Sequence, residues 1–279
     1  MTQTWGDLAT ALRMSPLTWS VLVVDASTGD ALLDVGSHRQ LKTASGAKIL
    51  VLLEAARQLE AGSLSAAELL PRDPALAAAD SGIWQHLSVP ELPVEDVARL
   101  VGMVSDNWAT NVLLHRVGGP QQVADTARRA RLHEVNLHDR VRDERGPGHP
   151  PTLSTGSAAG YADLLVRLHR GTLLSPAVSA RVREWLRDGV DLSMVAAAFG
   201  LDPLAHTHPD RRITVVHKTG TDAGVRVDVG IATGPSRSLA YACLANWTSE
   251  QDLDPWRDEA LAAMRAIGDA VRAEIDWAT

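Results

Sequence analysis

A serine and a lysine at the start of one helical stretch are the first residues whose types and spacing could do chemistry. The stretch is TASGAKILVLLEAARQLEAG, residues 43–62, and it carries Ser45 and Lys48 one helical turn apart. Both side chains therefore share a helix face, with Ser45 at the positive end of the helix dipole. This geometry suits a hydroxyl nucleophile activated by a neighbouring amine. The structural alternative is a helix-capping serine beside a surface lysine.

The scarcity of lysine supports the chemical interpretation. Lysine and arginine together number 27, yet the only lysines are Lys42, Lys48 and Lys218. Arginine always stays charged, whereas a buried lysine can lose its proton. Lys48 and Lys218 both belong to short polar motifs, so we interpret them as residues kept for their chemistry.

Two further polar motifs follow along the chain. Ser105, Asp106 and Asn107 form S-D-N in VSDNWATNVLL, and residues 218–220 form K-T-G at the end of the β-rich run ITVVHKTG. Taken singly, S-D-N is ordinary helix capping and K-T-G is a strand that leads into a glycine turn. The three motifs in this order are the signature of one enzyme class.

The sequence therefore resembles the class A β-lactamase family of penicillin-recognising serine hydrolases, and the resemblance covers nearly the whole chain. The stretch SDNWATNVLLHRVGGP is similar to the corresponding family stretch up to its Gly-Gly-Pro end. The resemblance implies that Ser45 attacks a strained amide and becomes acylated, that Lys48 helps to take its proton, and that Ser105 passes a proton to the leaving nitrogen. It further implies that Asn107 binds the substrate side-chain amide and Lys48, with Asp106 holding the loop.

The resemblance also assigns roles around the K-T-G motif. It implies that Lys218 supplies positive charge near a substrate carboxylate, that Thr219 donates a hydrogen bond to it, and that Gly220 belongs to the same substrate-binding strand. The backbone N–H of Thr221 and that of the nucleophile would form the oxyanion hole. Arg226, on the next strand, would pair with the substrate carboxylate; a surface arginine is the alternative.

One element of the family pattern is missing from the loop after the S-D-N helix. Class A enzymes carry E-x-x-L-N there, and its glutamate is accepted as the deacylation base. The comparable region, NLHDRVRDERGPGHPPTLST, lacks this pattern; its acids are Asp139, Asp143 and Glu144. Glu144 is the best substitute by residue type, but flanking arginines would lower its pKa and make it a poor base; a salt-bridged loop residue is the alternative. His149 is a second candidate for activating water.

Other reactive side chains have simpler interpretations. Cys243, the single cysteine, lies in the apolar run LAYACLANW and is predicted to be a small buried residue on a strand. His206 and His208 could bind a metal, but no H-E-x-x-H pattern supports a zinc hydrolase. Strand alternation predicts that His217 faces away from Lys218. We therefore expect neither a metal nor an organic cofactor.

The elements that must position these residues follow from periodicity. Helix, hairpin and strand patterns at both ends of the chain enclose a helical middle. The prediction is one β-lactamase-like α+β domain, residues 1–279. In it an antiparallel sheet with terminal helices is built from residues 1–44 and 210–279, beside a helical subdomain of residues 45–209. A cleft between the two parts is the expected site.

Composition excludes several other classes of function. The chain has 279 residues, is 45% hydrophobic and carries a formal charge of -7, without a basic stripe that would favour nucleic acid. No signal-peptide pattern or apolar run of about 20 residues is visible. The sequence as given therefore predicts a cytoplasmic monomer that does not enter a membrane; export is the alternative if a leader was removed.

The leading hypothesis is a β-lactamase-like hydrolase that opens a β-lactam through an acyl-enzyme on Ser45 and deacylates slowly. The first alternative is a cytoplasmic esterase or amidase that uses the same serine and lysine. The second is a penicillin-recognising binding protein that acylates without turnover. Each takes a small-molecule substrate.

Overall fold

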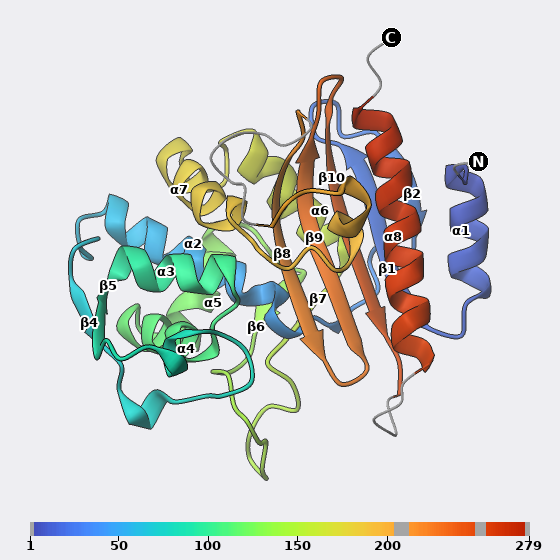
Figure 1. Ribbon diagram of the computed structural model, residues 1–279. Coiled ribbons are helices and arrows are strands. Elements are labelled where there is room, and N and C mark those ends of the chain that lie inside the picture. The colour runs from blue at the N-terminus through green and yellow to red at the C-terminus, as the bar shows by residue number, and fades with distance from the viewer. Residues whose placement is uncertain (1–2, 204–211, 249–254, 277–279) are drawn as a thin grey trace.

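The two ends of the chain build one antiparallel sheet. The computed structural model describes residues 3–203, 212–248 and 255–276. An early strand pairs with the last strand along its whole length, from Thr18 opposite Asn246 to Asp25 opposite Leu239, and Figure 1 shows these strands side by side. The predicted sheet is therefore confirmed. Its order is β2 (Ala31–Val35), β1 (Thr18–Asp25), β10 (Ser238–Asn246), β9 (Val225–Thr233) and β8 (Thr214–Asp222).

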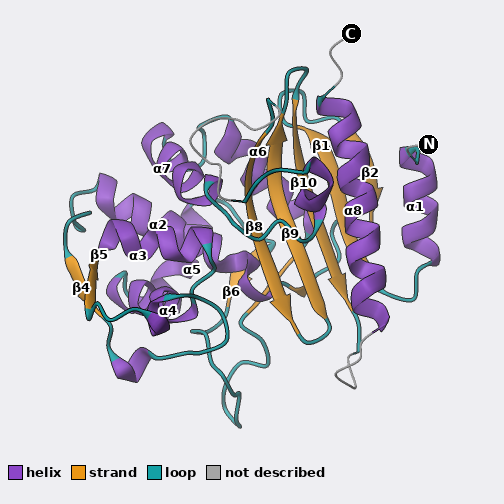
Figure 2. Ribbon diagram, in the orientation of Figure 1, coloured by secondary structure: helices purple, strands orange, loops and turns teal. Residues whose placement is uncertain are grey.

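Helices cover both faces of this sheet (Figure 2). The terminal helices α1 (Trp5–Met14) and α8 (Pro255–Ile275) lie on one face, as predicted, and α6 (Ala158–His169) packs on the other. Alternate residues of β1 point to opposite faces of the sheet. Trp19, Val21 and Val23 belong to the core under the terminal helices, whereas Val24 belongs to the larger core on the α6 side. These layers confirm the α+β fold class.

The rest of the chain is mainly helical and is organised around α2 (Lys48–Glu60), a helix that packs against α3, α5 and α7. Its residues from Lys48 to Ala56 are all buried, which makes it the central helix of this part. The helix predicted from Ser45 begins instead as a 3₁₀ turn, η1 (Ala44–Ala47), and α-helix starts at Lys48. The surrounding helices are α3 (Val94–Met103), α4 (Asn107–Arg116), α5 (Gly119–Arg129) and α7 (Pro176–Arg187).

Short strands that periodicity did not reveal support the start of α2. A three-stranded sheet of order β3-β7-β6 lies beside the η1 turn. The predicted boundary near residue 209 and the two histidines His206 and His208 lie outside the described residues. The remaining short elements are β3 (Leu41–Lys42), β4 (Leu69–Pro71), β5 (Glu91–Pro93), β6 (Val135–Leu137), β7 (Ser154–Gly156), η2 (Pro74–Leu76), η3 (Trp84–His86) and η4 (Val195–Phe199).

Within the described ranges, none of the helices is both long and apolar enough to cross a membrane.

Candidate active site

The turn that carries Ser45 is held in an unusual backbone conformation. Ala44 has φ of 44°, a left-handed value that costs a non-glycine residue free energy and persists only where its surroundings enforce it. The Ser154 hydroxyl donates to the Ala44 carbonyl across 2.7 Å and also lies 2.7 Å from the Thr43 hydroxyl. These contacts from β7 fix the turn, and they leave Ser45 partly exposed in a cleft.

Lys48 lies fully buried beneath this turn. Its Nζ donates to the Ser105 carbonyl at 2.6 Å, the Ser105 hydroxyl at 3.2 Å and Asn107 Oδ1 at 2.8 Å. Burial, followed by the positive charge of Lys218, lowers the pKa of Lys48 well below its usual value, although Asp106 and a second aspartate oppose this. The amine can therefore exist in the neutral form that accepts a proton.

The S-D-N segment is fixed by its central aspartate. Asp106 caps α4 by accepting from the Ala109 N–H, and it also accepts from the two N–H groups of residues 83–84, each at 2.8 Å. A Cβ at Gly82 would lie 2.3 Å from the carboxyl carbon of Asp106, so only glycine permits this close approach. Asp106 thereby ties a neighbouring loop to α4 and holds Ser105, whose φ is 57°, beside Lys48.

Gly220 lets the edge strand β8 lie directly against the Ser45 turn. A Cβ on Gly220 would be 2.4 Å from the Thr43 carbonyl oxygen and 2.9 Å from the Gly46 nitrogen, closer than real Cβ atoms come to other atoms, and 3.1 Å from the Ser45 nitrogen. Since Thr221 follows immediately, its backbone is brought to the nucleophile. The structure therefore places the two backbone segments of the expected oxyanion hole next to each other.

Lys218 is the second buried lysine, with 2% of its surface exposed, whereas Lys42 is exposed. Its Nζ donates to the Thr219 carbonyl at 2.9 Å. Burial lowers the pKa of Lys218 to about 8, against the opposing effect of Asp191 and Asp228. Lys218 therefore keeps most of its positive charge at neutral pH and loses it as the pH rises through about 8, and it lines the same cleft as Ser45.

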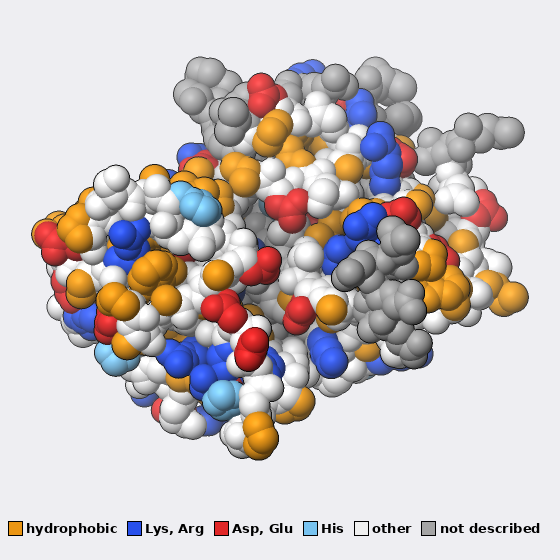
Figure 3. All heavy atoms as spheres, turned by 60° about the horizontal axis from the view of Figure 1, so that its bottom comes forward, with side chains coloured by type: hydrophobic (Ala, Val, Ile, Leu, Met, Phe, Trp, Pro, Cys, Tyr) orange, Lys and Arg blue, Asp and Glu red, His pale blue; other side chains and the backbone are white. Residues whose placement is uncertain are grey.

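The motif residues converge on a cleft of about 750 Å³ where β8 meets the helical part, and Figure 3 shows a hollow on this side of the molecule. Arg226 is not among the described residues that line this cleft. Its guanidinium donates to the Asp222 and Val225 carbonyls and lies 5.9 Å from the Trp247 ring centre. The predicted site residues on the wall are Ser45, Ser105, Asn107, Lys218, Thr219 and Thr221.

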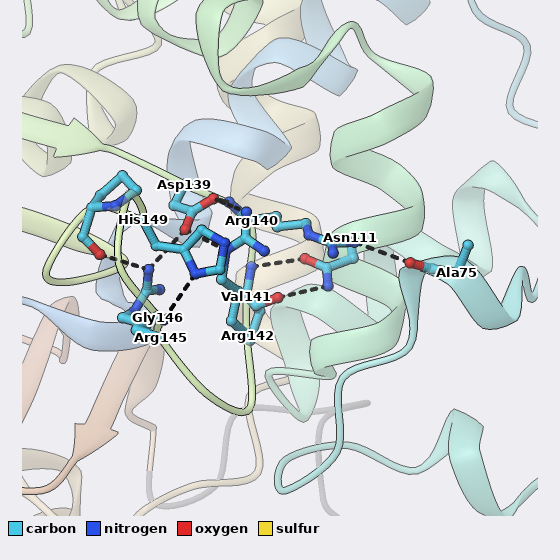
Figure 4. Close-up of polar contacts among 10 residues, drawn as sticks. Ala75, Asn111, Asp139, Arg140, Val141, Arg142, Arg145, Gly146 and His149 are labelled. Carbon is cyan, nitrogen blue, oxygen red and sulfur yellow. Dashed lines mark hydrogen bonds and ion pairs between the residues drawn. The ribbon is translucent and has the colours of Figure 1, made fainter.

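The loop after Leu137, which lacks the family glutamate, is held together by ion pairs among its own residues (Figure 4). Asp139 accepts from Arg142 at 2.7 Å and from Arg145 at 2.8 Å. Burial alone would raise the pKa of Asp139, but hydrogen bonds from these arginines hold it below its usual value. Glu144 is exposed and outside the cleft wall, as is His149, whose Nδ1 accepts from the Gly146 N–H at 3.1 Å. The structure thus brings neither candidate base to Ser45.

Val141 is the apolar residue among the four that residues 138–150 of this loop contribute to the cleft wall, the others being Arg142, Asp143 and Arg145. The Val141 N–H donates to Asn111 Oδ1 at 2.8 Å, and Asn111 Nδ2 donates to the Val141 carbonyl at 2.9 Å; Figure 4 shows the pair. The valine is buried and lines the cleft. Sequence reasoning missed it, because the signal was indirect: Asn111 is a polar residue on a helix face that turns out to be buried.

Two further residues with reactive side chains, Cys243 and His217, are buried. Cys243 is buried on β10, which confirms its predicted structural role. His217 is buried with Nδ1 3.0 Å from Asp228 Oδ1, and it also forms part of the cleft wall. Its partner Asp228 lies on β9 and also accepts from the Tyr241 hydroxyl, so the imidazole is held within a buried polar cluster.

Comparison with known sequences gives one consistent result. The family model described as "Beta-lactamase enzyme family" matches residues 5–275. β-Lactamase AST-1 of Nocardia asteroides is 30% identical over 177 residues, which are 60% of this chain and 52% of that protein. A β-lactamase of Streptomyces albus G is 28% identical over 189 residues, which are 67% of this chain and 56% of that protein. The chain spans little more than half the length of these curated relatives.

Comparison with solved structures shows the same fold. A PBP-A mutant, solved as an acyl-enzyme complex with penicillin G, has a TM-score of 0.80 at 22% identity and covers 96% of this chain and 95% of its own. A β-lactamase from Sphaerobacter thermophilus has a TM-score of 0.79 at 24% identity, and the match covers 96% of this chain and 94% of the Sphaerobacter chain. These likenesses confirm the predicted fold.

Proposed function

This chain belongs to the β-lactamase enzyme family, and from that membership we propose that it is a serine hydrolase working through an acyl-enzyme on Ser45. One observation carries the proposal: the buried Lys48 amine contacts both Ser105 and Asn107 one turn after a serine that opens into the cleft. An amine with a lowered pKa next to a hydroxyl is the arrangement that nucleophilic catalysis requires.

During acylation one proton passes from Ser45 to the leaving atom by way of Lys48 and Ser105. Neutral Lys48 takes the Ser45 hydroxyl proton while Oγ bonds to the substrate carbonyl carbon. The tetrahedral oxyanion is stabilised by the Ser45 and Thr221 N–H groups. The bond from carbon to the leaving nitrogen or oxygen then breaks, and Ser105 gives its hydroxyl proton to that atom. Ser105 recovers a proton from Lys48 across their 3.2 Å contact, which leaves the lysine neutral again.

Deacylation is the step for which the cleft is poorly equipped. A water must attack the ester carbonyl, the bond from that carbon to Ser45 Oγ must break, and the serine must regain a proton. In the proposed mechanism no loop carboxylate activates this water: Asp139 is held by Arg142 and Arg145, and Asp143, which lines the cleft, accepts from the Ala79 N–H at 2.8 Å. We therefore propose that the acyl-enzyme accumulates and decays slowly.

The proposed substrates are β-lactams, which the names of both curated relatives suggest. Esters or amides attacked by the same Ser45 are the second candidate, because the aspartates of the cleft wall would repel the carboxylate that penicillins and cephalosporins carry. A protein that acylates and stalls is the third; the PBP-A complex with penicillin G is a structural precedent for an acylated state in this fold.

Turnover of two chromogenic substrates tests the proposal. Wild type and Ser45→Ala are compared on a chromogenic cephalosporin and on p-nitrophenyl acetate. We expect Ser45-dependent product release on at least one of them, with an initial burst of about one equivalent and a slow steady rate. Equal rates for wild type and Ser45→Ala on both substrates contradict the proposal. The ratio of the two steady rates separates a β-lactamase from an esterase.

A further inference from the structure

An aspartate outside the three motifs stands on the cleft wall beside K-T-G. Asp191 follows α7 in a short segment that is anchored at two points. The Val190 N–H donates to the Met103 carbonyl at 3.1 Å, and a Cβ on Gly189 would lie 3.1 Å from His217 Nε2. The segment is therefore pressed against β8, and it sets Asp191 into the cleft wall.

The carboxylate of Asp191 is held at the residues that would receive a substrate carboxylate. Its Oδ1 accepts from the Ser193 hydroxyl at 2.6 Å and the Ser193 N–H at 3.2 Å. Burial raises the pKa of Asp191, but the interactions with Ser193, the Thr219 side chain and His217 lower it more. Asp191 is consequently ionised at neutral pH. Its negative charge attracts the ammonium group of Lys218 and so favours the protonated form of that lysine.

The neighbouring wall adds to this negative charge. Asp80, Asp143 and Asp222 also line the cleft, and Asp139 pairs with both arginines of the described wall, Arg142 and Arg145, so that five carboxylates stand against these two arginines and Lys218. Figure 3 shows acidic side chains gathered around the hollow. An excess of one sign of charge in a cleft attracts ligands of the opposite sign.

We propose that Asp191 is a specificity-determining residue that favours acyl substrates with a cationic leaving group and disfavours those with a carboxylate there. Ser105 is the proposed proton donor to the leaving atom, so the leaving group would lie beside it. Lys218 and Thr219 line the same cleft as Ser105, and we therefore assign the part of the cleft beside Asp191 to the leaving group. In effect the chain supplies its own carboxylate at Thr219. A second carboxylate meets like charge, and an ammonium meets opposite charge. This inference rests on the proposed acyl-enzyme function.

Three matched esters test the inference. Phenylacetate esters of meta-substituted phenols carry a trimethylammonium, a hydroxymethyl or a carboxylate group, and each kcat/KM is divided by the ester's own alkaline hydrolysis rate. We expect wild type to prefer the cation to the anion at least about tenfold. Asp191→Asn is expected to shrink that preference about fivefold or more, mainly through a faster anionic ester.

Asp188→Asn is the matched control, because it removes the same charge three residues away. Asp188 is ion-paired with Arg99 and Arg187 at 3.3 and 3.1 Å and lies outside the described cleft wall. We expect its cation preference to stay within about twofold of wild type, since paired, partly exposed charges act weakly at a distance. Asp191→Ser repeats the test if the asparagine variant does not fold.

The outcomes separate the two proposals. If the esters acylate Ser45 but the preference is equal in wild type, Asp191→Asn and Asp191→Ser, the inference about Asp191 is overturned and the acyl-enzyme stands. If intact mass shows that no ester modifies wild type in a way that Ser45→Ala abolishes, the proposed function fails and takes the inference with it.

Discussion

Lys48 Nζ and Asn107 Oδ1 lie 2.8 Å apart, and this hydrogen bond joins the first residue of α2 to the first residue of α4. All three acceptors described for Lys48 are neutral oxygens: a carbonyl, a hydroxyl and an amide. A carboxylate in hydrogen-bond contact would hold the proton on the amine, whereas neutral acceptors in a buried site leave it free to depart. The contact therefore connects two motifs and also defines the chemistry of the lysine.

The first prediction concerns the proton acceptor. Lys48→Arg keeps the charge but removes the ability to lose it, so we expect the rate of Ser45 acylation to fall at least about 100-fold. The measurement is the rate at which the mass of the protein increases with substrate. Lys42→Arg is the control, because Lys42 is exposed and its rate should be unchanged. Acylation of Lys48→Arg within about fivefold of wild type would refute the role.

The second prediction is a pH dependence set by Lys218. Because the pKa of Lys218 is lowered to about 8, its positive charge is present below that pH and is lost as the pH rises through it. We expect kcat/KM for a β-lactam that carries a carboxylate to fall on the alkaline side with an apparent pKa near 8, because the positive charge of Lys218 would bind that carboxylate. Lys218→Arg, which stays protonated, should move this fall to higher pH. An alkaline limb that is identical in wild type and Lys218→Arg speaks against Lys218 as its source.

The third prediction installs the missing base. Val141 is fixed by two hydrogen bonds to Asn111 and lines the same cleft as Ser45. A carboxylate at this position could activate water, so Val141→Glu should shorten the lifetime of the acyl-enzyme about 10- to 100-fold while acylation changes little. Val141→Gln, similar in size but unable to act as a base, is the control. Equal lifetimes for the two variants would show that this position does not reach the water.

The fourth prediction concerns the contact between β8 and the Ser45 turn. Gly220→Ala puts a Cβ 2.4 Å from the Thr43 carbonyl oxygen, so the strand must move away and the oxyanion hole must open. We expect acylation to slow about 100-fold or more, since the loss of one oxyanion donor alone has an effect of this size. Gly146→Ala is the control, because an added Cβ there meets no atom within 4 Å. Similar rates in both variants would count against the assigned geometry.

The sequence predicted the elements that depend on local pattern. The strands at both chain ends alternate or are continuously apolar, and the helix of Lys48–Glu60 has a long apolar run, so the type of these elements and the five-stranded antiparallel sheet followed from periodicity, whereas the short strands of the two smaller sheets did not. The three motifs were recognisable because chemistry restricts residue type as well as spacing. Ser105 and Lys218 are about a hundred residues apart in sequence, and they line the same cleft.

Other features depend on contacts between segments distant in sequence. Glu144 was the candidate base by residue type, but the bonds between the Val141 backbone and the Asn111 side chain hold the loop so that Val141 and Asp143 line the cleft and Glu144 does not. Asp191 gave no signal, because its position results from loop anchoring to Met103 rather than from any period. The orientation of Arg226, stacked by Trp247, likewise depends on tertiary packing.

The most direct test of the central claim is intact mass over time, with penicillin G and with the neutral phenylacetate ester, on wild type and Ser45→Ala. We expect an adduct on wild type that maps to Ser45, persists for longer than it takes to form, and is absent from Ser45→Ala. The penicillin adduct should form faster on Asp191→Asn than on wild type, because the substrate carboxylate then meets one like charge fewer. The same adduct on Ser45→Ala, or none on wild type with either compound, would contradict an acyl-enzyme on Ser45.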